Sequence, residues 1–221
     1  MDPGDKEMIV YEDADLVVCQ KPAGVLSEAG GMPELLKDTT GAAEIFCVHR
    51  LDRETAGLMV YARTQRAAAA LSAAIAARSL QKEYRAVLQG EPPEAGELRD
   101  LLFRDARKNK SYVVKRMRRG VREAVLHYET LDRRDGLSLL RVELETGRSH
   151  QIRVQFASRG FPLVGDGKYG SAFRDAPLAL FASALAFPHP VTGEGLRFEA
   201  APPSVWPWTL FSGNTDQKTE P

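Results

Sequence analysis

The sequence predicts an α+β protein in which helices flank a mixed, largely antiparallel β-sheet, and three observations support this fold class. Short apolar stretches rich in β-branched and aromatic residues recur along the chain, and turn-forming residues separate them. One alanine-rich stretch, 65–79, has the length and the apolar face of an amphipathic helix. The regular strand–helix alternation of a doubly wound fold is missing from the sequence.

The expected strands are the apolar, β-prone stretches at 8–11, 16–20, 45–48, 58–61, 82–90, 124–131, 137–145, 180–187 and 196–199. The polar turn 12–15 makes the first two strands a hairpin, and Pro22 ends the second because proline cannot donate a ladder hydrogen bond. A short helix is expected at 33–37, with a proline in its first turn. Thr64 is a suitable N-cap for the helix over 65–79.

The second half of the chain contains one clear hairpin signal and one clear helix signal. Asp135-Gly136 stands between two stretches that alternate apolar and polar residues, which strongly indicates a β-hairpin. Ser149 is expected to cap a helix over 150–158 that Gly160 closes. Residues 161–170 are expected to form a glycine-rich loop.

Size and composition are those of a globular protein, with 221 residues of which 43% are hydrophobic. We expect one domain over 1–211 and a disordered tail over 212–221, which lacks large apolar residues. No apolar run approaches the ~20 residues that a membrane span requires, and the polar N-terminus is unlike a secretory signal. Cys19 and Cys47, both expected in strands among apolar neighbours, fit a reducing cytoplasm better than a disulfide framework.

Basic residues are concentrated in one segment although the net charge of the chain is zero. From Arg104 to Arg122 there are nine basic residues and one acidic residue, so this segment carries +8 and the rest of the chain −8. Such a distribution favours a polyanion bound at one place, and the alternative is a solvated, mobile loop. Because Tyr112, Val113 and Val114 interrupt the segment, part of it is expected to be a strand that contacts RNA. The expected contacts with RNA phosphates are Lys110, Lys115, Arg116, Arg118 and Arg119.

The polar segment between the stretches 45–48 and 58–61 is the strongest candidate for a functional site. Two buried strands would fix its polar groups in position, which a catalytic residue requires. The neighbouring guanidinium groups of Arg50 and Arg53 are expected to keep Asp52 ionised. An ionised, oriented carboxylate can act as a nucleophile, a general base or a ligand. The alternative is a surface turn with exposed ion pairs, which are common and contribute only ~0–1 kcal/mol each.

The spacing within this segment distinguishes the two alternatives. Residues 49–58, His-Arg-Leu-Asp-Arg-Glu-Thr-Ala-Gly-Leu, closely resemble the active-site motif of the RluA-type pseudouridine synthases. In that family the aspartate is the catalytic nucleophile, so the resemblance implies this role for Asp52. Ala56 stands where the family usually has serine, a change that leaves the aspartate untouched.

Four further stretches resemble the same family in the same order: 17–24 with a Lys-Pro-Ala-Gly turn, 82–86, 145–170 and 189–193. The resemblance therefore extends from about Ile9 to Pro203 and implies the pseudouridine synthase fold. Gln155 and Phe181 depart from the usual pattern, and they are expected at the rim of the site or just behind it. Many members carry a small RNA-binding module ahead of this region, and none is expected here.

The resemblance also implies roles for other residues. Tyr84 would stack on the target uracil and help to remove its C5 proton, whereas outside the motif it would be interpreted as a packing residue. Arg153 would pair with Asp52 and orient its carboxylate, whereas an isolated example would be a solvent-facing helix arginine. Arg50 would fill the gap left when the uridine leaves the base stack. The other implied substrate contacts are Ile152, Arg53 and His150.

Metal, cofactor and nucleophile–base alternatives gain little support. Cys47-x-His49 has no closely spaced second pair of ligands, so we expect no metal. Ser149 and His150 are adjacent on a predicted helix and would point about 100° apart, which disfavours a nucleophile–base pair. The glycines of 165–170 match neither a P-loop nor a dinucleotide-binding pattern, and we expect no cofactor.

These features predict an isomerase that converts specific uridines of ribosomal or transfer RNA to pseudouridine without a cofactor. The alternative is a non-catalytic RNA-binding or RNA-chaperone module on the same fold. Such a module would not need the complete set of Asp52, Tyr84 and Arg153. RNA is the expected partner, and the protein is expected to be a cytoplasmic monomer with neither a membrane nor an obligate protein partner.

Overall fold

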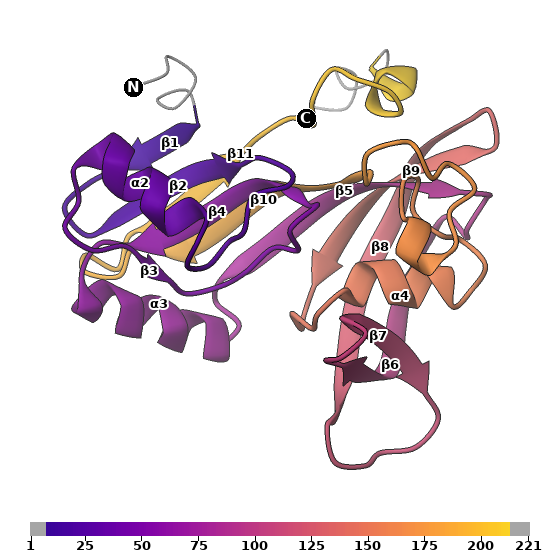
Figure 1. The fold of residues 1–221 in the computed structure, drawn as a ribbon, viewed down its shortest axis with the longest axis horizontal. Coiled ribbons are helices and arrows are strands. Elements are labelled where there is room, and N and C mark those ends of the chain that lie inside the picture. The colour runs from indigo at the N-terminus through magenta and orange to yellow at the C-terminus, as the bar shows by residue number, and fades with distance from the viewer. Residues whose placement is uncertain (1–7, 213–221) are drawn as a thin grey trace, which may run out of the picture. The chain divides into compact units, whose positions relative to one another are not determined.

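The computed structural model describes residues 8–212 and confirms the α+β class, with helices beside a mixed sheet (Figure 1). The chain divides into two compact units: residues 8–83 with Phe181–Ala201, and Tyr84–Leu180 with residues 202–212. Within the described part of the chain no helix has the length and apolar character to cross a membrane. The predicted disordered tail lies, except for Ser212, outside the described residues.

The first unit is built on a mixed sheet in which β1, β2, β4 and β10 are neighbours in this order, with β3 beside β4 and β11 beside β10. The bounds are β1 (Ile9–Glu12), β2 (Leu16–Lys21), β3 (Phe46–Cys47), β4 (Ala56–Ala62), β10 (Leu180–Pro188) and β11 (Gly195–Glu199). β2 runs antiparallel to both β1 and β4, whereas β10 runs parallel to β4. The predicted first hairpin and the two strands that flank the candidate segment are therefore confirmed.

Two helices belong to the first unit. α2 (Met32–Thr40) has the expected proline in its first turn and ends at Gly41, which adopts a left-handed conformation with φ 67°. α3 (Gln65–Ala76) begins as predicted at Thr64, whose hydroxyl oxygen accepts a hydrogen bond from the N–H of Ala67 at 3.1 Å. α3 packs Leu71 and several alanines against β2 and β4, so it covers one face of these strands (Figure 1).

The second unit contains a sheet with the strand order β5-β9-β8-β6-β7. The bounds are β5 (Gln81–Gln89), which starts in the first unit, β6 (Ala95–Asp105), β7 (Lys110–Val114), β8 (Val121–Arg134) and β9 (Leu137–Leu144). β8 pairs antiparallel with β9 and with β6, and β6 pairs antiparallel with β7. The predicted hairpin turn at Asp135-Gly136 is confirmed, with φ of 52° and 72°, and the strand predicted within the basic segment is β7.

β6 was not among the predicted strands. Its buried residues, Leu98 and Leu102, lie on one face of the strand, but the charged Asp100 stands between them on that face and breaks the apolar–polar alternation that indicates a half-buried strand. The strand is defined instead by a long pairing with β8, from Ala95 opposite Glu129 to Phe103 opposite Val121. Such pairing is a property of the folded chain and cannot be seen in the local sequence.

α4 (Gln151–Ala157) confirms the predicted helix but not its predicted cap. Its N-cap is His150, which has a left-handed backbone with φ 55° and makes no side-chain capping bond. Ser149 is not the cap, and its carbonyl accepts a hydrogen bond from the hydroxyl of Ser111 at 2.6 Å. The 3₁₀-helix η1 (Gly167–Tyr169) interrupts the predicted glycine-rich loop, and a second 3₁₀-helix, η2 (Trp208–Phe211), lies near the end of the described chain.

Candidate active site

Asp52 lies half-buried in the loop between β3 and β4, where polar residues were predicted to be fixed. The carbonyl of Asp52 accepts a hydrogen bond from the N–H of Thr55 at 3.0 Å, which closes a turn. On the other side, Leu51 makes two hydrogen bonds with Ser27. The Ser27 hydroxyl donates to the Leu51 carbonyl at 2.9 Å, and the Leu51 N–H donates to the Ser27 oxygen at 3.0 Å. The backbone on both sides of Asp52 is therefore held.

Lys21, from the Lys-Pro-Ala-Gly turn, holds the same loop from the end of β2. Its side chain is only 1% exposed, and its ammonium donates to the carbonyls of Pro22 and Val25 at 2.8 Å and of Arg53 at 3.0 Å. The N–H of Gly24 donates to the same Arg53 carbonyl at 2.8 Å, and the Arg53 Nε donates to the Gly24 carbonyl at 2.8 Å. The turn and the loop thus form one hydrogen-bonded structure.

Two buried bases next to the loop have lowered pKa values. Burial lowers the pKa of Lys21 to about 8, although the nearby carboxylates of Glu54 and Asp52 act in the opposite direction. Burial, followed by the charge of Lys82, holds the pKa of His49 well below its usual value, so His49 is neutral. The His49 Nε2 accepts the N–H of Val60 at 3.1 Å, which places the ring proton on Nδ1 and anchors the motif to β4.

Arg50 and Arg53 both have partners other than a carboxylate of the loop. The Arg50 guanidinium pairs with Glu28 at 2.9 Å, with the two side chains 56% and 54% exposed, and Arg53 bonds to Gly24 as described above. An exposed ion pair of this kind contributes little to stability, so the Arg50 guanidinium can exchange its partner at small cost. That Arg50 and Arg53 keep Asp52 ionised stays a prediction.

In the second unit, α4 buries both Ile152 and Arg153. Arg153 makes a bidentate pair with Asp166, in which Nε donates to Oδ2 at 2.6 Å and the second terminal nitrogen donates to Oδ1 at 2.9 Å. The alternative of a solvent-facing helix arginine is therefore wrong. Asp166 was given no role from the sequence, although it belongs to a stretch that resembles the family. Tyr84, on β5, is also buried.

His150 and Arg153 meet a further side chain, that of Tyr169 in η1. The Nδ1 of His150 lies 2.9 Å from the Tyr169 hydroxyl, and the N–H of Ser111 in β7 donates to the same hydroxyl at 2.8 Å. The guanidinium carbon of Arg153 lies 5.3 Å from the centre of the Tyr169 ring. Tyr169 was also given no role from the sequence.

Comparison with known proteins identifies the family. The profile of the RNA pseudouridylate synthase family matches residues 15–158. The chain is 36% identical over 231 residues to the ribosomal large subunit pseudouridine synthase D of Pseudomonas aeruginosa, an alignment that covers 91% of this chain and 70% of the relative. The chain belongs to the RNA pseudouridylate synthase family. It is thus an isomerase that acts on RNA, as predicted, and nothing favours the non-catalytic alternative.

Other relatives of this synthase agree with that assignment. The ribosomal large subunit pseudouridine synthase D of Zymomonas mobilis is 35% identical, over 88% of this chain and 69% of the relative. Among solved structures, Human RNA Pseudouridylate Synthase Domain Containing 4 is similar with a TM-score of 0.78 and 26% identity, over 94% of both chains. Human RNA Pseudouridylate Synthase Domain Containing 1, at a TM-score of 0.77 and 24% identity, shares the fold.

The basic segment of the synthase extends from the end of β6 through β7 to the start of β8. Lys110 lies in β7 and donates to the Lys168 carbonyl at 2.6 Å. Four exposed cations, here called the loop cations, lie between β7 and β8: Lys115, Arg116, Arg118 and Arg119. The Arg118 guanidinium lies 4.9 Å from the centre of the Phe103 ring. Figure 1 shows the β6–β7 pair and the adjoining part of β8 projecting beyond α4.

The two departures from the family pattern are both in the interior of the synthase. Gln155 has no exposed surface, and its amide nitrogen donates to the Leu98 carbonyl at 3.1 Å and to the Asp100 carboxylate at 2.8 Å. Phe181 is 4% exposed. Both residues therefore lie in the interior and not at an exposed rim, whereas the alternative expectation, a position just behind the site, stays a prediction. Both cysteines lie in strands as expected, Cys19 in β2 and Cys47 in β3, and Cys19 is buried whereas Cys47 is half-buried.

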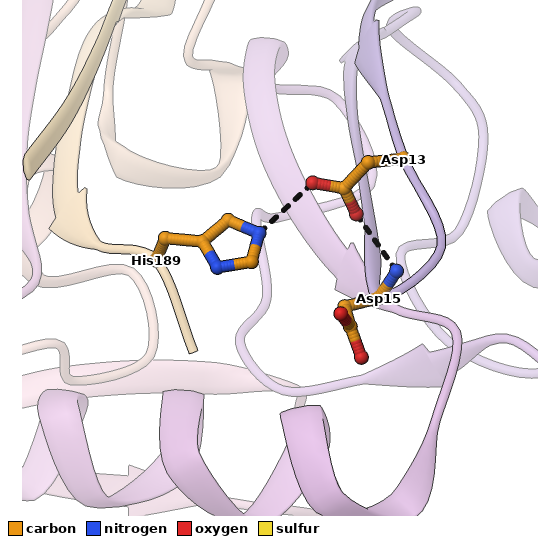
Figure 2. A group of neighbouring side chains, drawn as sticks. All are labelled: Asp13, Asp15 and His189. Carbon is orange, nitrogen blue, oxygen red and sulfur yellow. Dashed lines mark hydrogen bonds and ion pairs between the residues drawn. The ribbon is translucent and has the colours of Figure 1, made fainter. Parts of the chain in front are cut away.

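A group of side chains outside the predicted site has a spacing that could suit a cation. Asp13, Asp15 and His189 each place one potential ligand atom within 4.8 Å of the others (Figure 2). The His189 Nδ1 accepts two backbone N–H groups of the following turn, so Nε2 carries the hydrogen and donates it to Asp13 at 2.9 Å. The other oxygen of Asp13 accepts the N–H groups of Asp15 and Leu16. With these atoms already bonded, the group links the β1–β2 turn to the end of β10.

Proposed function

We propose that this synthase converts a uridine of large-subunit ribosomal RNA to pseudouridine, with Asp52 as the nucleophile. The relatives from Pseudomonas aeruginosa and Zymomonas mobilis, named for this activity, support the choice of RNA. The reaction breaks the bond from C1′ of the ribose to N1 of the base and forms one from C1′ to C5. The C5 proton is released to solvent and N1 takes up a proton, so the product has the same composition as the substrate. A carboxylate can form the intermediate bond and leave again, and the isomerisation needs no redox cofactor.

The observation that carries the proposal is the way in which the loop of Asp52 is held. Lys21, Gly24 and Ser27 bind the backbone of the residues immediately before and after Asp52, and His49 anchors the start of the motif to β4. Asp52 itself remains half-exposed within this fixed frame. A nucleophile must be held within about 0.5 Å of its productive position, and such a frame provides that constraint before RNA arrives.

The remaining roles in the proposal follow from the motifs. Arg153, whose guanidinium plane is fixed by its bidentate pair with Asp166, serves as the cation that orients the nucleophilic carboxylate. Tyr84 stacks on the target uracil and assists removal of the C5 proton. Arg50, which has an exposed and exchangeable ion pair, occupies the gap left by the everted uridine. The other substrate contacts in the proposal are Ile152, Arg53 and His150.

The basic segment supplies contacts to RNA phosphates away from the target uridine. The loop cations are exposed, and no acidic residue lies between Arg107 and Arg122, so an anionic backbone meets no repulsive charge within this stretch of the sequence. Lys110 adds a fifth contact from β7. We place the enzyme in the cytoplasm as a monomer, in keeping with a ribosomal RNA substrate.

The test measures tritium release from RNA that carries C5-tritiated uridine, with ribosomal and transfer RNA assayed separately. The wild type should release tritium from large-subunit ribosomal RNA, and Asp52→Asn should lose at least ~10³-fold in rate because it lacks the nucleophile. Glu54→Gln, the same chemical change at an exposed position of the same loop, should keep the wild-type rate. Equal release by the wild type and Asp52→Asn would refute the role of Asp52, and release from transfer RNA alone would refute the substrate.

A further inference from the structure

We propose that Tyr169 is a positioning residue that holds Arg153 and His150 and joins them to β7, the strand of the basic segment. The inference rests on the proposed function, because it takes Arg153 to be the orienting cation of the reaction. Every contact that supports it lies within the second unit.

The hydroxyl of Tyr169 connects the start of α4 with β7. It lies 2.9 Å from the Nδ1 of His150, the residue directly before α4. It also accepts the N–H of Ser111 at 2.8 Å and lies 3.2 Å from the Ser111 carbonyl oxygen. The Ser111 hydroxyl in turn donates to the Ser149 carbonyl at 2.6 Å. One phenol oxygen therefore fixes the separation between β7 and the first turn of α4.

The ring and backbone of Tyr169 act on Arg153 from two directions. The guanidinium carbon of Arg153 lies 5.3 Å from the ring centre, a distance at which the π-electrons attract the cation. The backbone N–H of Tyr169 donates to the carbonyl of Asp166 at 3.1 Å, and the carboxylate of Asp166 makes the bidentate pair with Arg153. Moving Tyr169 would therefore disturb both the face and the edge of the guanidinium group.

Lys110 connects this arrangement with the residues proposed to bind RNA. Its ammonium lies 5.0 Å from the centre of the Tyr169 ring and donates to the carbonyl of Lys168, the preceding residue. The ammonium of Lys168 donates back to the carbonyl of Asn109, immediately before β7. Because the same tyrosine ring contacts Lys110 and Arg153, a force on β7 from bound RNA reaches Arg153 through it. A residue that only filled space would not need the polar contacts of the hydroxyl.

The first test compares Tyr169→Phe with Tyr128→Phe, the same change at a buried tyrosine of the same unit. The Tyr128 ring packs edge-on against Phe156, and its hydroxyl has no hydrogen-bond partner among residues 8–212. Tyr169→Phe should lower kcat about 10-fold with KM changed less than about twofold, because a misplaced orienting group slows the chemical step. Tyr128→Phe should keep both constants. A wild-type kcat in Tyr169→Phe, or an equal loss in both variants, would overturn the proposal.

The second test asks whether Tyr169 acts through Arg153. In an Arg153→Lys background, Tyr169→Phe should cause less than about a twofold further loss of kcat, because the group that it positions has already been altered. A full second loss would show that Tyr169 acts independently and would overturn the proposal. A readout that needs no activity is the solvent exchange of the Arg153 Nε proton, followed by NMR. Exchange should be several-fold faster in Tyr169→Phe than in the wild type or Tyr128→Phe, and unchanged exchange would contradict the proposal.

The third test separates the connection to β7 from RNA binding in general. Lys110→Met should lower kcat as well as RNA affinity, whereas Lys115→Met, which removes a cation with no contact to Tyr169, should weaken affinity alone. An effect of Lys110→Met on affinity alone would refute the connection. The outcomes also distinguish the two proposals. If Asp52→Asn is inactive while Tyr169→Phe has the wild-type kcat, only the positioning role fails, and if Asp52→Asn is fully active, the proposed function fails.

Discussion

Replacement of Lys21 by methionine tests whether the loop of Asp52 depends on a buried cation. Methionine has a similar length and fills the same space, but it cannot donate to the carbonyls of Pro22, Val25 and Arg53. The Arg53 carbonyl would keep the N–H of Gly24 as a donor, whereas the other two carbonyls would lose the lysine. The change should therefore destabilise the fold and loosen the backbone directly after Asp52.

The magnitude follows from two opposing contributions. Hydrogen bonds from a charged donor contribute ~1.5–3 kcal/mol each, so three of them contribute roughly 5–9 kcal/mol. The drop of the Lys21 pKa from 10.5 to about 8 corresponds to about 3.4 kcal/mol for keeping the ammonium charged in the interior. The difference places the loss of unfolding free energy for Lys21→Met at about 3 kcal/mol. For a chain of this size, that is a fall of roughly 6–12 °C in Tm.

The assays are chemical denaturation at pH 7 and tritium release below the melting temperature of the variant. Lys37→Met is the matched control, because it makes the same change at an exposed position of α2. Lys21→Met should lose about 3 kcal/mol and at least ~10-fold in kcat, whereas Lys37→Met should lose less than about 0.5 kcal/mol. Equal stability of the two variants would refute the claim that the three hydrogen bonds hold the loop.

The pH dependence of stability provides a second test of the buried Lys21 ammonium. Because the pKa of folded Lys21 is about 8, below its ordinary value of 10.5, the unfolded chain binds more protons than the folded chain between these pH values. The wild type should therefore gain up to about 3.4 kcal/mol from this group as the pH rises through that window, and the methionine variant should not. The difference in stability between them should widen with pH, and a constant difference would contradict the burial of a charged ammonium.

Two further predictions concern other parts of the molecule. Burial raises the pKa of Asp13, but hydrogen bonds from the following backbone, His189 and Tyr11 lower it to about 2. Asp13→Asn should therefore lose ~1–2 kcal/mol at pH 7, and urea denaturation should show this loss disappearing between about pH 4 and pH 2. Reversal of the four loop cations to glutamate should reduce the slope of RNA affinity against salt by about 3, since each phosphate contact accounts for ~0.7–0.9. Reversal of Lys37 and Arg66 is the control, and an unchanged slope for the loop variant would exclude phosphate contacts there.

The sequence predicts most of the fold because its signals are local. The hairpin turn at Asp135-Gly136 requires two residues with positive φ, and the N-cap at Thr64 requires one hydroxyl near one N–H, so each can be recognised within a few residues. β6 lacks such a signal, since its pairing with β8 joins residues up to 34 positions apart, as Ala95 and Glu129 are. The left-handed His150 could not be predicted either, because its ring contacts Tyr169 of η1 and the preceding Ser149 carbonyl contacts Ser111 of β7, and both partners are distant in the sequence.

In the candidate site, too, some features can be predicted from the local sequence and others depend on the folded chain. The motif around Asp52 can be read from consecutive residues, but the burial of Lys21 cannot. Three carbonyls, from residues 22, 25 and 53, must converge before an ammonium is stable in the interior, and this convergence exists only in the folded chain. His49 is a comparable case, since the motif marks its position while the contact with the Val60 N–H shows that it anchors the strand. Motif residues can therefore support a loop without touching the substrate.

The ion pair between Arg153 and Asp166 is compatible with a role of Arg153 in the reaction. A guanidinium group has five N–H donors in one plane, and Asp166 accepts bonds from Nε and from one terminal nitrogen. These two atoms form one edge of the guanidinium group. The pair with Asp166 therefore fixes the plane of the group and also the direction in which its opposite edge points. A lysine would keep the charge but not the plane, because an ammonium rotates freely about its single bond. If the role of Arg153 is to orient a carboxylate, the role depends on this plane, and Asp166 and Tyr169 are then as necessary for it as the positive charge.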